Sequence, residues 1–487
     1  MFWKGLWGYL PANVLQGLIG FATLITFTRL LSPDDYGRYA LAFGVSSLAQ
    51  TLCFTWIEAA MARFYPSESR EDREALTLYG TLYRLFAAVT VVFAVVCAAG
   101  LWLWPAPDAH TQALKLAIGC GLGVVVFRSL IKMVQEQRRS EGRVGTASTL
   151  DMIQTAGGFG LGALLAWAGL GGGAPLLAAG LVAAACLPFV AREDWGRALK
   201  GRFDATRARQ YAHYGLPVSA SLILTLALYT VDRFLIAGFL SEADAGAYHA
   251  GYSLASRILD VLFLWFGAAG GPALVHALES RGTEALKAHA RDQFRVMALV
   301  LFPAVGGLIA VEAPLAQLLI GEGLRAQALS VTALISVGAL LSGFNTYYFL
   351  QAFTLSKKTR LLTVAMAIPA IANVGLNLWL IPLYGLWGAG LATALSFAIG
   401  LIGSWILGRQ ALPLPVPWRD LGLTALATLI MVAVVRLIPP LGGVIELALK
   451  GVAGVLVYAA LALALNLNEV RAHGQRFLKR LGVGSAA

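Results

Sequence analysis

The sequence predicts an all-α membrane protein that crosses the bilayer about fourteen times. Hydrophobic residues make up 58% of its 487 residues and charged residues only 13%, a composition outside the range of ordinary soluble domains. Apolar runs of roughly 18 to 25 residues recur along the chain, and each can cross a hydrocarbon core of about 30 Å. Lysine and arginine gather in alternate loops between these runs. These three observations together predict a polytopic helical protein.

The apolar runs set the expected spans in chain order. We place them at residues 8–31, 36–62, 76–104, 113–133, 145–168, 174–191, 214–239, 246–275, 293–312, 329–352, 361–381, 386–407, 421–438 and 445–466. We expect the first to remain as a membrane helix, because no small-residue cleavage site follows its apolar run. The longest polar stretch, near 192–213, is too short for a separate domain. A sizeable catalytic domain outside the membrane is therefore not expected.

The formal net charge of +11 is a topology signal rather than a nucleic-acid footprint. Most lysines and arginines lie in every second loop and at both ends of the chain, with few in the intervening loops. Cytoplasmic loops of membrane proteins carry this excess of positive charge. The pattern predicts that both termini are cytoplasmic and that the number of spans is even, and it gives no reason to expect a nucleic-acid partner.

A nine-residue motif occurs twice, about two hundred residues apart. Residues 31–39 read LSPDDYGRY and residues 240–248 read LSEADAGAY, sharing the skeleton L-S-x-x-D-x-G-x-Y. Serine followed three residues later by aspartate is a variant capping box, which satisfies free N–H groups at the start of a helix. Glycine allows a neighbouring backbone to approach, and tyrosine suits the membrane boundary. The motif therefore predicts two structural repeats.

The two copies are separated by an even number of spans, so the repeats are expected to be parallel. This predicts an N-terminal lobe of six spans over residues 1–191 and a C-terminal lobe of six spans over 214–407. Residues 192–213 form the link between them, with Trp195, Leu199 and Phe203 on one face of an amphipathic helix expected to lie on the cytoplasmic leaflet. Two appended spans follow over 408–466, and 467–487 form a cytoplasmic tail.

Ionisable residues inside spans are costly and usually face a cavity or one another. Arg257 and Asp260 share one helix face near the middle of span 246–275, where they either neutralise each other or line a cationic cavity. Asp232 is the stronger candidate for a cavity position than its neighbour Arg233, and Arg257 is a candidate partner for it. Asp260 could instead adjust the local positive charge at Arg257 or carry a proton.

Four further charged residues fall near the ends of spans in the first half. Glu58 and Arg84 lie at similar depths on consecutive antiparallel spans, so we expect an ion pair at the inner mouth. Arg29 and Arg38 flank the first capping box, where boundary anchoring is favoured over ligand contact, although both point toward the same mouth.

Signatures of catalysis and of metal or cofactor binding are missing from the sequence. It contains no H-E-x-x-H, G-x-S-x-G, P-loop or dinucleotide-binding pattern, and the four cysteines lie in apolar runs without paired spacing. We therefore expect no catalytic residue, no metal site and no cofactor, and we do not expect an enzyme.

The motifs together resemble a known family. Residues 29–33 (RLLSP) leading into 36–40 (YGRYA), 232–234 (DRF) with 246–248 (GAY), and 381–389 (IPLYGLWGA) are similar to the polysaccharide flippases of the multidrug/oligosaccharidyl-lipid/polysaccharide exporter superfamily. The resemblance implies a V-shaped pair of six-helix lobes, as in MATE transporters, in the cytoplasmic (inner) membrane of a bacterium. It also implies transfer of undecaprenyl-diphosphate-linked oligosaccharide, such as an O-antigen or exopolysaccharide unit, from the inner to the outer leaflet by alternating access.

The resemblance also implies which residues and partners take part. A cationic cavity of this family receives the diphosphate, and Arg257 matches the expected position in the eighth span best, with Arg29 and Arg38 matching approximately. Apart from the resemblance, Arg84 is a further candidate for the cavity because it lies inside a span. If an ion drives transport, Glu58, Asp232 or Asp260 would carry it. Besides the lipid bilayer, a polysaccharide polymerase and the chain-length machinery are candidate partners.

Two other functions stay open at this point. A cation-coupled multidrug antiporter of the same superfamily should favour acidic over basic residues in its cavity, which the arginines inside the spans oppose. A membrane glycan polymerase or ligase usually needs a substantial outer loop, and the loops expected on that side are short.

Overall fold

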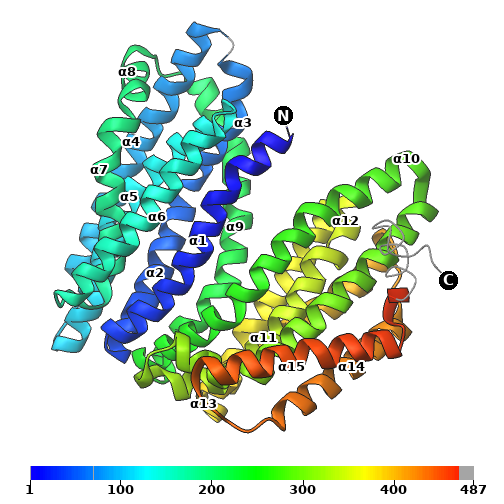
Figure 1. Cartoon of the computed structure of the whole chain (residues 1–487). Coiled ribbons are helices and arrows are strands. Elements are labelled where there is room, and N and C mark those ends of the chain that lie inside the picture. Colours follow the sequence, from blue (N-terminus) through cyan, green and yellow to red (C-terminus); the bar gives the residue numbers. More distant parts are fainter. Residues whose placement is uncertain (1, 70, 471–487) are drawn as a thin grey trace. The chain divides into compact units, whose positions relative to one another are not determined.

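The structure is a computed structural model that describes residues 2–69 and 71–470, and within these ranges the regular elements are helices, with no strand (Figure 1). The chain divides into two compact units, Met1–His249 and Ala250–Ala487, which are described one at a time. The sequence expectation of an all-α fold is confirmed.

The N-terminal unit is a bundle of long helices joined by short turns (Figure 1). Its elements are α1 (Phe2–Leu30), α2 (Pro33–Cys53), α3 (Thr55–Glu68), α4 (Asp72–Leu103), α5 (Ala109–Ser140), α6 (Val144–Trp167), η1 (Gly171–Gly173), α7 (Ala174–Val190), α8 (Arg192–Lys200), α9 (Ala205–Phe239) and the first turns of α10 (Glu242–Leu319). One apolar core of this unit joins α3, α4 and α5, with Ile57, Leu78 and Met133 fully buried.

The C-terminal unit contains the remainder of α10 and the elements that follow. These are α11 (Glu322–Phe344), η2 (Asn345–Phe349), α12 (Gln351–Leu355), α13 (Thr359–Ala411), α14 (Trp418–Arg436), α15 (Gly443–Ala464) and η3 (Leu467–Glu469). Two of the helices are broken by a glycine in the left-handed half of conformational space, Gly282 in α10 (φ 77°) and Gly385 in α13 (φ 58°). Only glycine adopts such angles without strain, so each long helix consists of two segments.

Every predicted span falls on helix. The breaks at Gly282 and Gly385 separate the predicted spans 246–275 and 293–312, and 361–381 and 386–407. Ten helices in the described part are long and apolar enough to cross a membrane, or eleven if α2 and α3, which are bent by 47° at their junction, count as one span. The single straight span expected at 36–62 is thus two helices that meet at Phe54.

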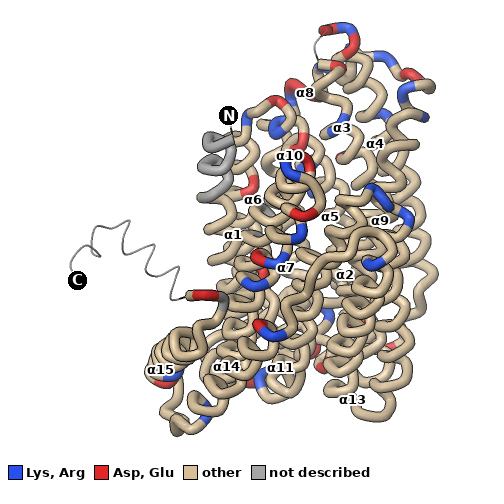
Figure 2. The backbone as a smooth tube through the Cα atoms, turned by 90° about the vertical axis from the view of Figure 1, so that its right-hand side faces the viewer, with Lys and Arg blue, Asp and Glu red and all other residues tan. Residues whose placement is uncertain are grey.

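Charged residues gather near α8 and near the turn between α3 and α4, whereas long stretches of the helices carry none (Figure 2). The predicted amphipathic helix is present from Arg192 to Lys200, with Leu199 84% exposed. The prediction that Phe203 continues the apolar face of this helix is wrong, because α8 ends at Lys200 and α9 begins only at Ala205. Its position on the cytoplasmic leaflet stays a prediction, as does the division into lobes at 192–213.

Candidate functional site

The two copies of the nine-residue motif meet within the N-terminal unit. Ser32 Oγ accepts a hydrogen bond from the backbone N–H of Asp35 at 3.1 Å, and Ser241 Oγ accepts one from the N–H of Asp244 at 3.0 Å. Both serines therefore form the predicted N-caps, while each aspartate side chain accepts a hydrogen bond from the serine hydroxyl, Asp35 from Ser32 and Asp244 from Ser241.

The shared glycines make the contact between the copies. A Cβ on Gly37 would lie 1.8 Å from the carbonyl oxygen of Glu242, and one on Gly246 would lie 2.8 Å from the nitrogen of Gly37. No side chain can be accommodated at Gly37 without moving backbone. The predicted role of this glycine, close approach of a neighbouring backbone, is confirmed, and the neighbour is the second copy of the motif itself.

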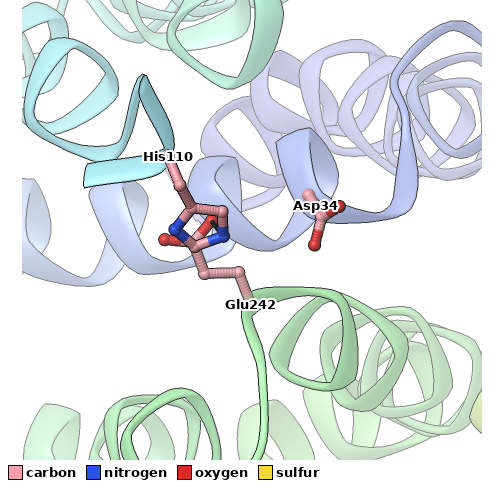
Figure 3. Close-up of side chains that lie close together, drawn as sticks. All are labelled: Asp34, His110 and Glu242. Carbon is pink, nitrogen blue, oxygen red and sulfur yellow. Dashed lines mark ion pairs between the residues drawn. The ribbon is translucent and has the colours of Figure 1, made fainter. Parts of the chain in front are cut away.

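A charged cluster surrounds this junction (Figure 3). Arg38 Nη1 lies 2.9 Å from Asp35 Oδ1, and Arg38 Nε lies 2.7 Å from Glu242 Oε2. His110 Nε2, at the start of α5, lies 3.2 Å from the same Glu242 oxygen. Arg38 is thus held by two carboxylates and ties α2 to the start of α10, so its contacts in this structure are those of an anchor.

The same cluster offers three atoms that could ligate a metal ion. The ligand atoms of Asp34, His110 and Glu242 all lie within 4.8 Å of one another. However, the guanidinium of Arg38 already neutralises Glu242 and competes with a cation for its oxygen. We therefore assign the cluster to holding the motif copies together. Neither Glu242 nor His110 is among the candidate residues of the sequence analysis, because Glu242 occupies a variable position of the motif and His110 lies outside the predicted spans.

The predicted ion pair between Glu58 and Arg84 is wrong. Glu58 is buried and its Oε2 lies 3.4 Å from Lys132 Nζ of α5. Arg84 is exposed and donates from Nη2 to the carbonyl of Gly201, at the end of α8, at 3.0 Å. The reason is the docking of α8 against α4, which offers Arg84 a free helix-terminal carbonyl.

Lys132 and Arg128 are the residues that sequence reasoning missed. Both lie inside the predicted span 113–133, but neither is among the ionisable residues that the sequence analysis considers inside spans. Arg128 lines a cavity of about 250 Å³ together with Thr23, Gln154 and Thr155. The remaining lining residues are mostly apolar or aromatic: Ile19, Phe27, Tyr39, Gly158, Phe159, Pro175 and Ala179. The signal that could have found Arg128 is its depth in an otherwise apolar stretch of α5.

Asp232 and Arg233 are both buried in the N-terminal unit. Asp232 Oδ2 accepts a hydrogen bond from the hydroxyl of Tyr248 at 2.8 Å, and Arg233 Nη1 donates to the carbonyl of Tyr229. Tyr248 is the tyrosine that ends the second motif copy. This tyrosine therefore reaches a buried carboxylate, a role that the sequence did not indicate.

The remaining predicted site residues do not gather into one cluster within a unit. Arg29 is exposed at the end of α1 and donates to the carbonyl of Ile25 at 3.0 Å. In the C-terminal unit Arg257 is half-buried and Asp260 is exposed, one turn apart on α10. Their place in a common cationic cavity stays a prediction.

Uncharged polar side chains form a second interior cluster, in the C-terminal unit. Asn377 Nδ2 donates to the carbonyl of Asn373 at 2.9 Å, and Ser396 Oγ donates to the carbonyl of Thr393 at 2.9 Å. All four side chains are buried between the two halves of α13. Sequence reasoning passed over them because it considered only ionisable residues inside spans.

One pKa outside the membrane-spanning helices is strongly displaced. Burial against α4 and α5 raises the pKa of the Asp194 carboxyl, in α8, to about 6, although Arg138 Nη2 lies 3.8 Å away. Desolvation of the carboxylate thus outweighs the attraction of the guanidinium. The position of Asp194 in the fold therefore resists ionisation of its carboxyl group.

The fold defines a class of protein: a helical, multi-pass membrane protein that holds polar groups inside its spans. The chain belongs to the family described as polysaccharide biosynthesis protein, whose model matches residues 26–327. This match confirms the resemblance found in the sequence motifs. A search of curated protein sequences finds no match.

Solved structures share the fold at low sequence identity. The inward closed conformation of the lipid II flippase MurJ is 14% identical, with a TM-score of 0.76 over 95% of this chain and 99% of that one. An inward-facing multidrug resistance MATE family transporter of the MOP superfamily is 16% identical, with a TM-score of 0.65 over 81% of this chain and 94% of that one. A MATE protein in complex with MaL6 gives 15% identity and a TM-score of 0.53, over 83% and 94% of the two chains. The fold is therefore that of the flippases and transporters of this superfamily.

Proposed function

We propose that the protein is a flippase that moves an undecaprenyl-diphosphate-linked oligosaccharide from the inner to the outer leaflet of a bacterial cytoplasmic membrane. The observation that carries the proposal is membership of the polysaccharide biosynthesis family by a chain with the fold of a lipid II flippase. The distribution of lysine and arginine supports a cytoplasmic location for both termini.

The physical problem that such a protein solves is the passage of a sugar head group through hydrocarbon. Each unpaired polar group in the bilayer core costs several kcal/mol, so the head group needs a polar route while the lipid tail stays in the bilayer. Arginines inside the spans suit the diphosphate, because the guanidinium presents a planar fork of donors to phosphate oxygens. Alternating access is the mechanism we propose for exposing this route to each side in turn.

Arg257 is the residue we assign to the diphosphate in the C-terminal unit, with Asp260 beside it as the acid most suited to tuning its charge or carrying an ion. Glu58 and Asp232 are poorer carriers in this structure, because Lys132 and Tyr248 already contact their carboxylates. Arg38 and Arg84 are likewise engaged by protein groups and serve the scaffold. A polymerase and the chain-length machinery are the partners that would receive the flipped product.

Reconstitution tests the proposal directly. Proteoliposomes loaded with a fluorescent polyprenyl-diphosphate oligosaccharide are treated with an external glycosidase, and time-dependent cleavage of the inner-leaflet pool measures flipping. We expect Arg257→Ala to slow flipping at least about tenfold, the loss of one charge-assisted contact, and Arg257→Lys to retain part of it. Insertion and folding of both variants are checked by their elution as single species in detergent. Equal rates with and without the protein would reject the flippase.

The MATE likeness makes a multidrug antiporter the second candidate. The same proteoliposomes distinguish the two: an antiporter would accumulate a cationic dye against an ion gradient and leave the labelled lipid in place. A polymerase or ligase would instead lengthen the glycan, which gel analysis of the extracted lipid would reveal.

A further inference from the structure

We propose that the cavity around Arg128, in the N-terminal unit, is a binding site for a phosphate or diphosphate group. Arg128 lies on α5 and its cavity of about 250 Å³ is lined otherwise by residues of α1, α2, α6 and α7, so the whole site belongs to one unit. This inference rests on the proposed function for the identity of the ligand, and deepens it by locating a second cationic contact apart from Arg257.

The first observation is a guanidinium without an acceptor. Among the described residues no ion pair or hydrogen bond involves Arg128. Tyr39 and Glu58 act on it electrostatically, and the carboxylate of Glu58 lies 3.4 Å from Lys132 Nζ. An arginine inside a membrane span that makes no such contact is costly and marks a place where an anion or water compensates it.

The second observation is independent and concerns a different helix. Gln154 of α6 lines the same cavity, and its amide nitrogen is buried without a hydrogen-bond partner. Buried donors are nearly always satisfied in native proteins, so an orphaned amide beside an unpaired guanidinium points to an acceptor that both can share. The hydroxyls of Thr23 and Thr155 add two further donors on the cavity wall.

The chemistry of these groups selects the ligand. Guanidinium, amide and hydroxyl groups all donate to oxygen, and among the residues lining the cavity none is acidic, so a cation finds no counter-charge there. The cavity is smaller than the roughly 300 to 1,000 Å³ of sites that enclose drug-sized ligands. It therefore suits a phosphate or diphosphate head group and excludes an oligosaccharide, which would have to lie elsewhere.

Binding to the purified full-length protein tests the site without requiring transport. The probes are geranylgeranyl diphosphate, inorganic pyrophosphate and the neutral alcohol geranylgeraniol, each titrated against thermal unfolding in detergent at constant ionic strength. We expect the diphosphate to stabilise the wild type and Arg128→Gln to weaken its binding at least about tenfold, since hydrogen bonds to a charged group are the strongest available. Gln154→Leu should weaken it by about threefold.

Two controls keep the result interpretable. Arg192→Gln removes the same charge from an exposed position at the start of α8 and should bind as the wild type does. If Arg128→Gln fails to fold, Gln154→Leu carries the test, because it leaves the charge in place. Stabilisation by pyrophosphate alone would show that the free anion suffices, whereas stabilisation only by the prenyl compound would assign the site to the lipid.

Some results overturn the site. Equal affinity of wild type and Arg128→Gln for the diphosphate, or equal stabilisation by the neutral alcohol, would reject it. The two proposals can be rejected separately. Diphosphate binding that depends on Arg128, without flipping in proteoliposomes, would support the binding site and reject the proposed flippase function. Flipping by the wild type, together with unchanged diphosphate binding in Arg128→Gln, would support the flippase function and reject the binding site.

Discussion

The N-terminal unit and the part of the C-terminal unit formed by α10 to α13 differ in the kind of polar group that they bury; elsewhere in the C-terminal unit, α15 buries the Glu446–Lys450 ion pair. In the N-terminal unit the buried polar side chains include charged ones, among them Glu58, Asp232, Arg233 and Glu242. In the described part of α10 to α13 that belongs to the C-terminal unit, the buried polar side chains are those of serine, threonine and asparagine. A buried charge needs a specific partner, whereas a neutral amide or hydroxyl can be satisfied by its own helix backbone.

The difference teaches where the molecule depends on fixed tertiary contacts. The N-terminal unit holds its charges through contacts between helices, such as Glu58 of α3 with Lys132 of α5 and Arg38 of α2 with Glu242 of α10. The C-terminal unit satisfies Asn377 and Ser396 from within α13. We therefore expect substitutions at helix contacts of the N-terminal unit to be the more damaging ones.

The largest effect is expected at the junction of the motif copies. Gly37→Ala places a methyl 1.8 Å from the carbonyl oxygen of Glu242 and should destabilise the protein by about 3 kcal/mol, because backbone has to move. Gly251→Ala, whose Cβ would lie 2.7 Å from the Ala328 carbonyl in the C-terminal unit, should cost less.

Thermal unfolding in detergent measures both changes. Gly17→Ala is the control, since nothing lies within 4 Å of its added methyl. It should be neutral or slightly stabilising, because alanine favours helix over glycine. Equal loss in Gly37→Ala and Gly17→Ala would contradict the close contact.

A smaller effect is expected from breaking the interior ion pair. Lys132→Met leaves the Glu58 carboxylate buried without its partner and should cost about 2 kcal/mol. The double variant Glu58→Leu with Lys132→Met removes both charges and should recover most of that stability.

The matched change in the C-terminal unit is Asn373→Leu, which replaces a buried neutral amide and should cost less than about 1 kcal/mol. Midpoints of thermal unfolding for the wild type, these three variants and the single variant Glu58→Leu decide the comparison. Independent, additive costs in the double variant would show that Glu58 and Lys132 are not coupled.

The smallest effect concerns pH. Because the pKa of Asp194 is raised to about 6 in the folded protein, the folded state binds this proton more tightly than the unfolded state does. Its contribution to stability is therefore present below about pH 4 and is lost as the pH rises to about 6. Asp194→Asn removes this loss, so the stability of the variant relative to the wild type should increase as the pH rises from 4.5 to 7. Parallel unfolding profiles over that range would show that burial of Asp194 does not resist its ionisation.

The sequence was sufficient to predict the helices and the family. A membrane helix is recognised from the length and hydrophobicity of one segment, because apolar side chains and unpaired backbone groups in that segment determine whether it can cross the bilayer. The capping boxes of Ser32 and Ser241 and the close approach at Gly37 followed from local chemistry in the same way. The partners of charged residues were not predicted correctly: Glu58 was expected to pair with Arg84, and Arg128 was not recognised as a charged residue inside a span.

Only the tertiary structure decided these pairings, since the depth of a side chain does not say which neighbouring helix faces it. The end of α8 lies against α4, so that Arg84 donates to the carbonyl of Gly201. The packing of α5 against α3 places Lys132 next to Glu58, and the packing of five helices places Arg128 and Gln154 on the wall of one cavity. Hydrophobic length is a property of a single segment and can be read from it. The position of a charge relative to its partner depends on how segments far apart in the chain are packed together.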